Sequence, residues 1–270
     1  MARTIASEYN INTGKLNNPL KIALVSDLHQ RDPEDAVNLI AANNPDLILV
    51  AGDIIERYAP KANKKYMNST VKIPLRRRFL LSTVYYINHT VTAFTKMLTS
   101  FTEDNSFALF RELSDIAPVY AAPGNHEQLF LPEEYKFFDE YNIKMLENAD
   151  EAVEINGEKI IIGGLENPID RKWFRSFVKK KGFKILICHY PEYYEKFFKK
   201  RKINVIVSGH AHGGQVHIKG KALYSPGQGF FPKYTNGVYD NRLVVSAGCS
   251  NTVAVPRINN PREIVIINLT

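Results

Sequence analysis

Side chains that bind metal ions recur directly after short apolar segments of this sequence. The apolar run 47–51 is followed by a glycine and Asp53, and the run 21–26 is followed by Asp27 and, one residue on, His29. Runs of this length and composition predict buried strands, and open α/β sheets bind their ligands outside the carboxyl ends of such strands. The mixture of oxygen and nitrogen ligands without thiolate suits Mn, Fe or Zn.

Two pairs of these side chains share one spacing. Asp27 and His29 are separated by a single residue, and so are His210 and His212. If the local backbone is extended, the two side chains of a pair leave it on the same side and can hold one cation. Glycines beside the second pair allow the backbone to approach a ligand closely. Asp53 is then the natural carboxylate to bridge two cations.

Further ligand types follow two other predicted strands. Asn125, which can add a neutral oxygen, comes after the run 118–122, and His189 ends the run 184–188. Each motif alone has an ordinary explanation, such as a turn or a packed histidine. All of them together, each after an apolar strand, favour a metal site. Cys188 precedes His189 in its strand and points to the opposite face, so we expect it in the core.

The order of the predicted elements indicates the fold class. Strands and helices alternate up to residue 208, later elements are mostly strands, and Asn156-Gly157 predicts a two-residue hairpin turn. This pattern predicts an α/β fold: a layered α/β/β/α sandwich of two mixed sheets with flanking helices. We expect a single domain over residues 1–270 with a helical insertion at about 57–104. The predicted strands are 21–26, 47–51, 118–122, 144–146, 152–155, 159–162, 184–188, 204–208, 215–218, 221–224, 243–246 and 264–268. The predicted helices are 34–44, 106–115, 132–141, 171–181 and 192–200, and residues 1–18 are expected to form an extended lead-in.

Composition limits the classes of partner and location. The chain has 270 residues, 44% of them hydrophobic, and a formal net charge of +7, which fits one domain with a large core and an anionic partner. Lys and Arg are widely dispersed, so nucleic acid is not the expected partner. The first 18 residues lack a signal-peptide pattern, and no window approaches the ~20 apolar residues that span a bilayer. We expect a cytoplasmic protein, soluble or peripheral to the membrane, with two reduced cysteines.

Five motifs follow one another along the chain: Asp27-x-His29, Gly52-Asp53, Gly124-Asn125-His126-Glu127, His189 and Gly209-His210-x-His212. In this order they resemble those of the calcineurin-like metallophosphoesterase superfamily, in particular its small bacterial phosphoesterases. The resemblance covers residues 21 to 215 and implies that His126 contacts the scissile phosphate without binding metal. Glu56 stands where relatives often have an aspartate that orients this histidine. The implied ligands are Asp27, His29, Asp53 and His212 for one metal ion, and Asp53, Asn125, His189 and His210 for the second.

The resemblance implies a dinuclear metal-dependent phosphoesterase that hydrolyses a phosphomonoester or phosphodiester. Two Mn, Fe or Zn ions would share Asp53 and a hydroxide that attacks phosphorus in line. His126 would stabilise the developing charge or protonate the leaving oxygen. Two alternatives stay open: a lipid-linked pyrophosphatase of the UDP-diacylglucosamine type, which would hold acyl chains in the insertion, and a non-catalytic scaffold on the same fold.

The predicted insertion contains an unusual helix. Apolar residues recur from Leu80 to Phe101 in steps of four and three, and Lys96 is the only charged residue over 79–101. This is the a/d seam of three heptads, and such a helix needs an apolar partner. The preferred hypothesis is a cap packed on the core or on a second subunit, which would make a homo-oligomer. The alternatives are a lid over an acyl-bearing substrate and a peripheral membrane contact through 79–101.

Overall fold

The computed structural model describes residues 4–56, 104–127, 130–218, 221–225, 227–250 and 257–270. The insertion expected at about 57–104 falls almost wholly outside these ranges, and its heptad helix does so entirely. Within the described ranges, no helix is long and apolar enough to cross a bilayer.

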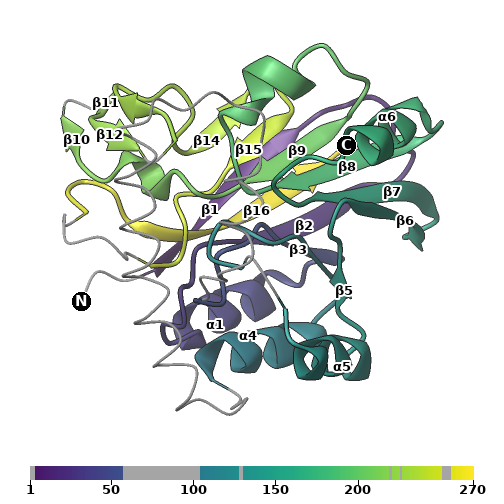
Figure 1. Ribbon diagram of the computed structural model, residues 1–270, viewed down its shortest axis with the longest axis horizontal. Coiled ribbons are helices and arrows are strands. Elements are labelled where there is room, and N and C mark those ends of the chain that lie inside the picture. The colour runs from purple at the N-terminus through teal and green to yellow at the C-terminus, as the bar shows by residue number, and fades with distance from the viewer. Residues whose placement is uncertain (1–3, 57–103, 128–129, 219–220, 226, 251–256) are drawn as a thin grey trace, which may run out of the picture.

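Two six-stranded mixed sheets form the centre of the molecule (Figure 1). In the first sheet β2, β3, β4 and β5 run parallel, and β16 lies antiparallel to β2. In the second, β7, β8, β9 and β15 run parallel, with antiparallel strands at both edges. The first sheet has the order β1 (Thr4–Ile11), β16 (Arg262–Leu269), β2 (Leu20–Val25), β3 (Leu47–Val50), β4 (Val119–Ala121), β5 (Lys144–Met145). The second has the order β14 (Gly237–Tyr239), β15 (Leu243–Val245), β9 (Val205–Ser208), β8 (Phe183–Cys188), β7 (Glu158–Leu165), β6 (Ala149–Ile155).

Helices cover the outer face of each sheet. The first sheet is covered by α1 (Glu34–Asn43), α4 (Asn105–Ser114) and α5 (Pro132–Glu140). The second is covered by α6 (Arg171–Lys179) and the short π-helical turn η1 (Tyr194–Phe198). The layers are therefore helix, sheet, sheet, helix, and the predicted α/β/β/α sandwich is confirmed.

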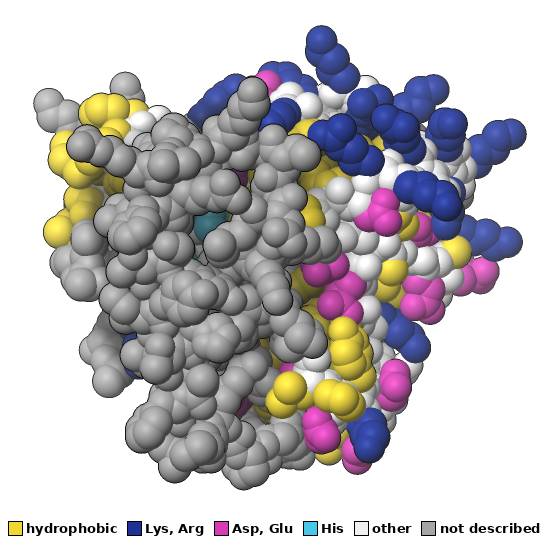
Figure 2. Space-filling model, in the orientation of Figure 1, with side chains coloured by type: hydrophobic (Ala, Val, Ile, Leu, Met, Phe, Trp, Pro, Cys, Tyr) yellow, Lys and Arg dark blue, Asp and Glu magenta, His cyan; other side chains and the backbone are white. Residues whose placement is uncertain are grey.

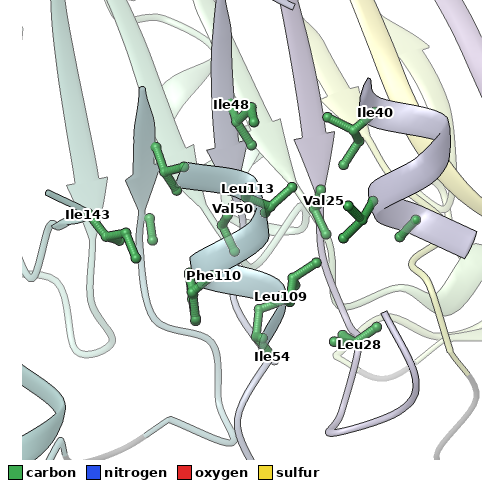
Figure 3. Close-up of a cluster of buried hydrophobic side chains, with 14 of the residues drawn as sticks. Val25, Leu28, Ile40, Ile48, Val50, Ile54, Leu109, Phe110, Leu113 and Ile143 are labelled. Carbon is green, nitrogen blue, oxygen red and sulfur yellow. The ribbon is translucent and has the colours of Figure 1, made fainter. Parts of the chain in front are cut away.

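The central strands bury side chains on both faces. Leu24 of β2 packs into the apolar layer between the sheets together with Ile185 of β8. Its neighbour Val25 points the other way, into the layer under α1 and α4, where Phe110 also lies (Figure 3). Strands buried on both faces read as continuous apolar runs, which explains why the sequence pattern located them. Full burial of each such side chain contributes about 1.5–3 kcal/mol.

The hairpin at Asn156-Gly157 is confirmed. Both residues have positive φ, 51° and 78°, and Ile155 of β6 faces Glu158 of β7 directly across the turn. A type I′ turn requires positive φ at both central positions, which is why Asn-Gly is its preferred sequence.

Three segments differ from the expectations. The residues expected only as an extended lead-in contain the edge strand β1, which pairs in parallel with β16 near the other end of the chain. The helix expected at 192–200 is reduced to η1, whose closing bond from Lys199 N–H to the carbonyl of Tyr194 spans five residues. The strands expected at 215–224 are two-residue pieces: β10 (His217–Ile218), β11 (Lys221–Ala222) and β12 (Tyr224–Ser225), the last paired with β13 (Gly229–Phe230).

Candidate metal centre

The predicted ligands lie just beyond the ends of five parallel strands from both sheets. β2, β3 and β4 carry them in the first sheet, and β8 and β9 in the second. The structure brings these side chains together in overlapping clusters whose ligand atoms lie within 4.8 Å of one another. One of them, the Asp27 cluster, contains Asp27, His29 and His212. A second, the His189 cluster, contains Asp53, His189 and His210. A further cluster joins His29, Asp53 and His126.

In the Asp27 cluster, ligand atoms face one another at distances too long for hydrogen bonds. Oδ1 of Asp27 lies 3.6 Å from Nε2 of His212 and 4.0 Å from Nε2 of His29. Nε2 of His29 is buried and has no hydrogen-bond partner among the described residues. Buried polar atoms normally have a partner, and a cation held between these three side chains would supply one. The residues present therefore fit a bound metal ion.

In the His189 cluster, a backbone carbonyl fixes the tautomer of the central histidine. Nδ1 of His189 lies 2.6 Å from the carbonyl oxygen of Ala51. A carbonyl can only accept, so Nδ1 carries a proton and Nε2 is left as the ligand atom. That Nε2 lies 3.1 Å from Oδ2 of Asp53 and 3.1 Å from Oδ1 of Asn125. The predicted neutral oxygen of Asn125 therefore lies beside this cluster.

Asp53 lies at the centre of the whole arrangement. Its Oδ2 is 3.1 Å from Nε2 of His189 and 3.9 Å from Nε2 of His29. Its Oδ1 accepts a hydrogen bond of 2.9 Å from the backbone N–H of His126. The carboxylate is buried, and although burial favours its neutral form, His189 and the other nearby histidines lower its pKa. This geometry suits a carboxylate that two cations share.

The backbone at the ligands differs from the expectation. We expected an extended backbone at Asp27-x-His29 and His210-x-His212, but all four residues have left-handed φ, between 47° and 66°. Left-handed φ is uncommon for residues other than glycine and costs about 1–3 kcal/mol at each position. Tertiary contacts hold the turns: the N–H of His210 lies 3.1 Å from both carboxylate oxygens of Asp27.

Two glycines allow the ligand loops to touch. Gly52 has φ +80°, and a Cβ there would lie 2.4 Å from the backbone nitrogen of Gly124. A Cβ on Gly209 would lie 2.4 Å from Oδ2 of Asp27. Both distances are too short for non-bonded atoms. A larger residue at position 52 would push the Asp53 loop away from the Asn125 loop, and one at position 209 would push the His210 loop away from Asp27.

Glu127 ties the Asp53 loop to the Asn125 loop. Its buried carboxylate accepts four backbone hydrogen bonds, of 2.7–2.9 Å, from Gly124, Asp53, Ile54 and Ile55. Burial and the charge of Asp53 raise its pKa, while the four N–H donors favour the ionised form. The sequence motif contains Glu127, but its role in joining the two loops was missed. The signal for this role is its place three residues after Gly124, in the loop that follows the buried strand β4.

Glu56 reaches two histidines at once. Its Oε1 lies 2.5 Å from Nδ1 of His29, and its Oε2 lies 2.7 Å from Nδ1 of His126. Burial opposes ionisation, but the hydrogen bonds to His126 and His29 hold the pKa of Glu56 at about 2. The sequence led us to expect the contact with His126, and the contact with His29 was missed. The glutamate thus connects a predicted metal ligand with the histidine predicted to contact phosphate.

The histidines of the His189 cluster have opposite protonation tendencies. Burial disfavours a charged His189, but the Asp53 carboxylate outweighs it and raises the pKa to about 10. Burial and the positive charge of His189 lower the pKa of His210 to about 3. A proton and a metal ion compete for the same Nε2 of His189, so metal binding there must release a proton.

The two cysteines lie outside this ligand set. Both are buried and free, and burial raises the pKa of Cys249 to about 12 and that of Cys188 further. Cys188 packs under α6 and η1, on the face of β8 turned away from the other sheet, as expected. Neither thiol is accessible as a thiolate ligand.

Comparisons with known proteins identify the family of this chain. The sequence model of the calcineurin-like phosphoesterases matches residues 20–214. The uncharacterized protein YpbG of Bacillus subtilis is 23% identical over 257 residues, which cover 93% of this chain and 81% of that protein. "Putative metallophosphoesterase F40B5.2" of Caenorhabditis elegans is 27% identical over 172 residues, or 56% of this chain and 35% of that protein.

Among solved structures, a 5'-nucleotidase precursor from Thermus thermophilus aligns with a TM-score of 0.43 at 15% identity, over 74% of this chain and 43% of that one. The chain therefore spans less than half the length of both the Caenorhabditis elegans protein and this nucleotidase precursor. The family model, in contrast, matches well over half of the chain. The protein belongs to the calcineurin-like phosphoesterase family and is a metal-dependent phosphoesterase.

Proposed function

We propose that the protein hydrolyses a phosphomonoester or phosphodiester at a dinuclear metal centre in which Asp53 is shared by the two ions. The observation that carries this proposal is the position of Asp53 Oδ2, 3.1 Å from His189 and 3.9 Å from His29. Those histidines belong to different clusters and come from different sheets. A carboxylate between two sets of ligands is what a two-ion site needs.

The proposed ligands divide between the two clusters. Asp27, His29, His212 and Asp53 would hold one ion, and Asp53, Asn125, His189 and His210 the other. Bound ions would polarise the phosphoryl oxygens and lower the pKa of a water molecule. The set of imidazole, carboxylate and amide ligands suits Mn, Fe or Zn.

His126 is the proposed proton donor to the leaving group. Glu56 accepts a hydrogen bond from its Nδ1, so its Nε2 faces the centre, 3.8 Å from Oδ2 of Asp53. Burial lowers the pKa of His126, but the Glu56 hydrogen bond and the charge of Asp53 raise it above its usual value overall. A raised pKa favours the protonated imidazole, which is the state that a general acid requires. Its side chain is 15% exposed, so a substrate can reach it.

Metal removal and a substrate screen test this proposal together. We expect two ions per chain by elemental analysis, loss of hydrolysis after chelation, and recovery with Mn. The screen covers monoesters, diesters and a lipid-linked pyrophosphate, because the lipid alternative depends on the insertion outside the described residues. Full hydrolysis by chelated protein that holds less than one ion per ten chains would contradict the proposal, and so would a single bound ion in the fully active protein.

A further inference from the structure

A cavity of about 420 Å³ lies on the outer side of the second sheet, between α6 and η1. Basic and aromatic side chains form much of its wall. Three arginines, Arg171, Arg175 and Arg201, line it together with three aromatic residues, Phe174, Tyr193 and Phe197. The volume falls within the range of about 300–1,000 Å³ that is typical of small-molecule sites.

The three arginines give the cavity an unbalanced positive charge. Arg171 and Arg175 are one helical turn apart on α6, and Arg201 follows η1, so the lining arginines come from two separate segments. None of the cavity's lining residues is Asp or Glu. Among the described residues, no carboxylate forms an ion pair with these arginines. The neighbouring Asp170 is engaged with the backbone N–H groups of Lys172 and Trp173 as the N-cap of α6.

The surrounding surface is basic as well. Figure 2 shows Lys and Arg side chains gathered along the top and upper right of this view, where α6 lies in Figure 1. An anion is therefore attracted to this face, and paired guanidinium groups bind phosphate with good geometry.

Aromatic rings connect the cavity with the metal centre. Tyr193 in the cavity wall stacks on Tyr190, with ring centroids 5.1 Å apart. Tyr190 in turn contacts the proposed ligand His210, also at 5.1 Å. Asn167 accepts a hydrogen bond from the Tyr193 hydroxyl and donates one to the Tyr190 hydroxyl, at 3.0 and 3.4 Å. One tyrosine thus separates the cavity wall from a ligand of the reacting centre.

We propose that this cavity binds a second, unreacted phosphate of the substrate, with the organic part of the molecule against Tyr193 and Phe197. The arginines suit the phosphate, since they offer paired donors, and the ring faces suit a flat or apolar body. This inference rests on the proposed function, because it assigns the cavity to the substrate of that metal centre. It narrows the substrate class to phosphate esters that carry two separate phosphate groups.

The test removes two arginines and uses two probes that differ by one phosphate. The variant Arg171→Gln/Arg175→Gln is compared with Lys172→Gln/Lys179→Gln, which loses the same charge from the same helix outside the cavity. Binding of adenosine 3′,5′-bisphosphate and of adenosine 5′-monophosphate is measured by calorimetry on chelated protein, so the result does not depend on turnover. We expect the arginine variant to weaken bisphosphate binding about tenfold or more, and the lysine variant by less than about twofold.

Kinetics with metal-loaded protein separate this inference from the proposed function. For p-nitrophenyl phosphate, which has one phosphate, the arginine variant should keep the wild-type kcat and KM. For the bisphosphate, KM should rise about tenfold with kcat unchanged. Equal losses in the arginine and lysine variants, or an equal loss for both nucleotides, would overturn the cavity assignment and leave the metal centre unaffected. Failure of the metal-loaded wild type to hydrolyse any ester would instead contradict the proposed function.

Discussion

The two clusters of the candidate metal centre are supported in different ways. In the His189 cluster, the imidazole of His189 is fixed by the backbone carbonyl of Ala51, which belongs to the sheet framework. In the Asp27 cluster, the imidazole of His29 is fixed by Glu56, whose side chain is 28% exposed and also holds His126. Mutation can remove the side-chain support but not the backbone support. The ligand geometry of the Asp27 cluster can therefore be altered by mutating Glu56. Through Glu56 it is also coupled to the proposed proton donor.

The largest effect is expected for the residue that both clusters share. Asp53→Asn should lose both ions and lower kcat/KM by more than about 10³-fold, because each bound ion contributes several kcal/mol of transition-state stabilisation. His29→Ala and His189→Ala should each weaken the binding of one ion. Elemental analysis and turnover of the three variants measure this. Two ions retained by the Asp53→Asn protein would mean that Asp53 is not the shared carboxylate.

A large effect of another kind is expected for His126, which belongs to neither of the two ligand sets. His126→Ala should keep both ions while kcat falls by about 10²–10⁴-fold, as for a lost general acid. The comparison with His29→Ala is informative, since both imidazoles contact Glu56. If His126→Ala loses metal as readily as His29→Ala does, His126 is a ligand and not a proton donor.

Glu56 variants test the coupling of the Asp27 cluster to His126. Glu56→Gln can accept from only one of the two Nδ1–H groups, and Glu56→Asp is too short by one methylene to reach both. Each should lower the affinity for one ion by about 10–100-fold, as for other partners of metal-bound histidines, and should also lower kcat. The second ion should stay, since its histidine is held by Ala51. Metal titrations followed by Co²⁺ absorption would show this, and equal weakening of both ions would contradict the separate support of the clusters.

As the pH falls, protonation should lower the metal affinity of one cluster more than that of the other. Asp53 raises the pKa of His189 to about 10, so below that pH a proton occupies the nitrogen that the metal needs. Metal affinity at the His189 cluster should therefore decrease as the pH is lowered, by up to about tenfold per pH unit. The pKa of His212 in the Asp27 cluster is lowered, first by burial, so that histidine offers no such competition. Metal binding measured from pH 6 to 8 should show the steeper decrease at the His189 cluster; equal slopes would contradict this.

The sequence predicted those parts of the molecule that depend on local pattern. β2 and β3 are buried on both faces, so each reads as an apolar run, and the ligands directly after them could be placed at one edge of a sheet. β1 could not be predicted in the same way. Its polar side chains show no strong alternation, and its hydrogen bonds go to a strand more than 250 residues away, such as the pairing of Thr4 with Arg262.

The details of the centre were missed for the same reason. The left-handed backbone at Asp27 depends on His210, which donates to its carboxylate from a different sheet. The contact of Glu56 with His29 and the four bonds of Glu127 exist only where loops from separate strands meet. A motif identifies the residue types at such a position, but it does not show which backbone groups arrive there from elsewhere in the chain.

The smallest expected effect is a loss of folding stability when the hydrogen bonds from Glu127 to the Asp53 loop are removed. Glu127 uses both carboxylate oxygens, each accepting two backbone N–H groups. In Glu127→Gln one oxygen becomes an NH₂ group that faces two donors, so two buried N–H groups lose their partner. The free energy of unfolding should fall by about 1–3 kcal/mol, measured by urea denaturation.

Glu158→Gln is the matched control for this last substitution. Glu158 is also buried, but a single oxygen, Oε1, accepts from the backbone N–H groups of both Asn17 and Asn18. A glutamine can turn its carbonyl oxygen to that side and keep both bonds, so its stability should stay within about 0.5 kcal/mol of the wild type. Because Glu127 holds the loop that carries Asp53, its variant should also bind both ions less tightly, whereas the control should bind them normally. Equal stability of the two variants would show that the bonds to Glu127 do not hold the Asp53 loop in place.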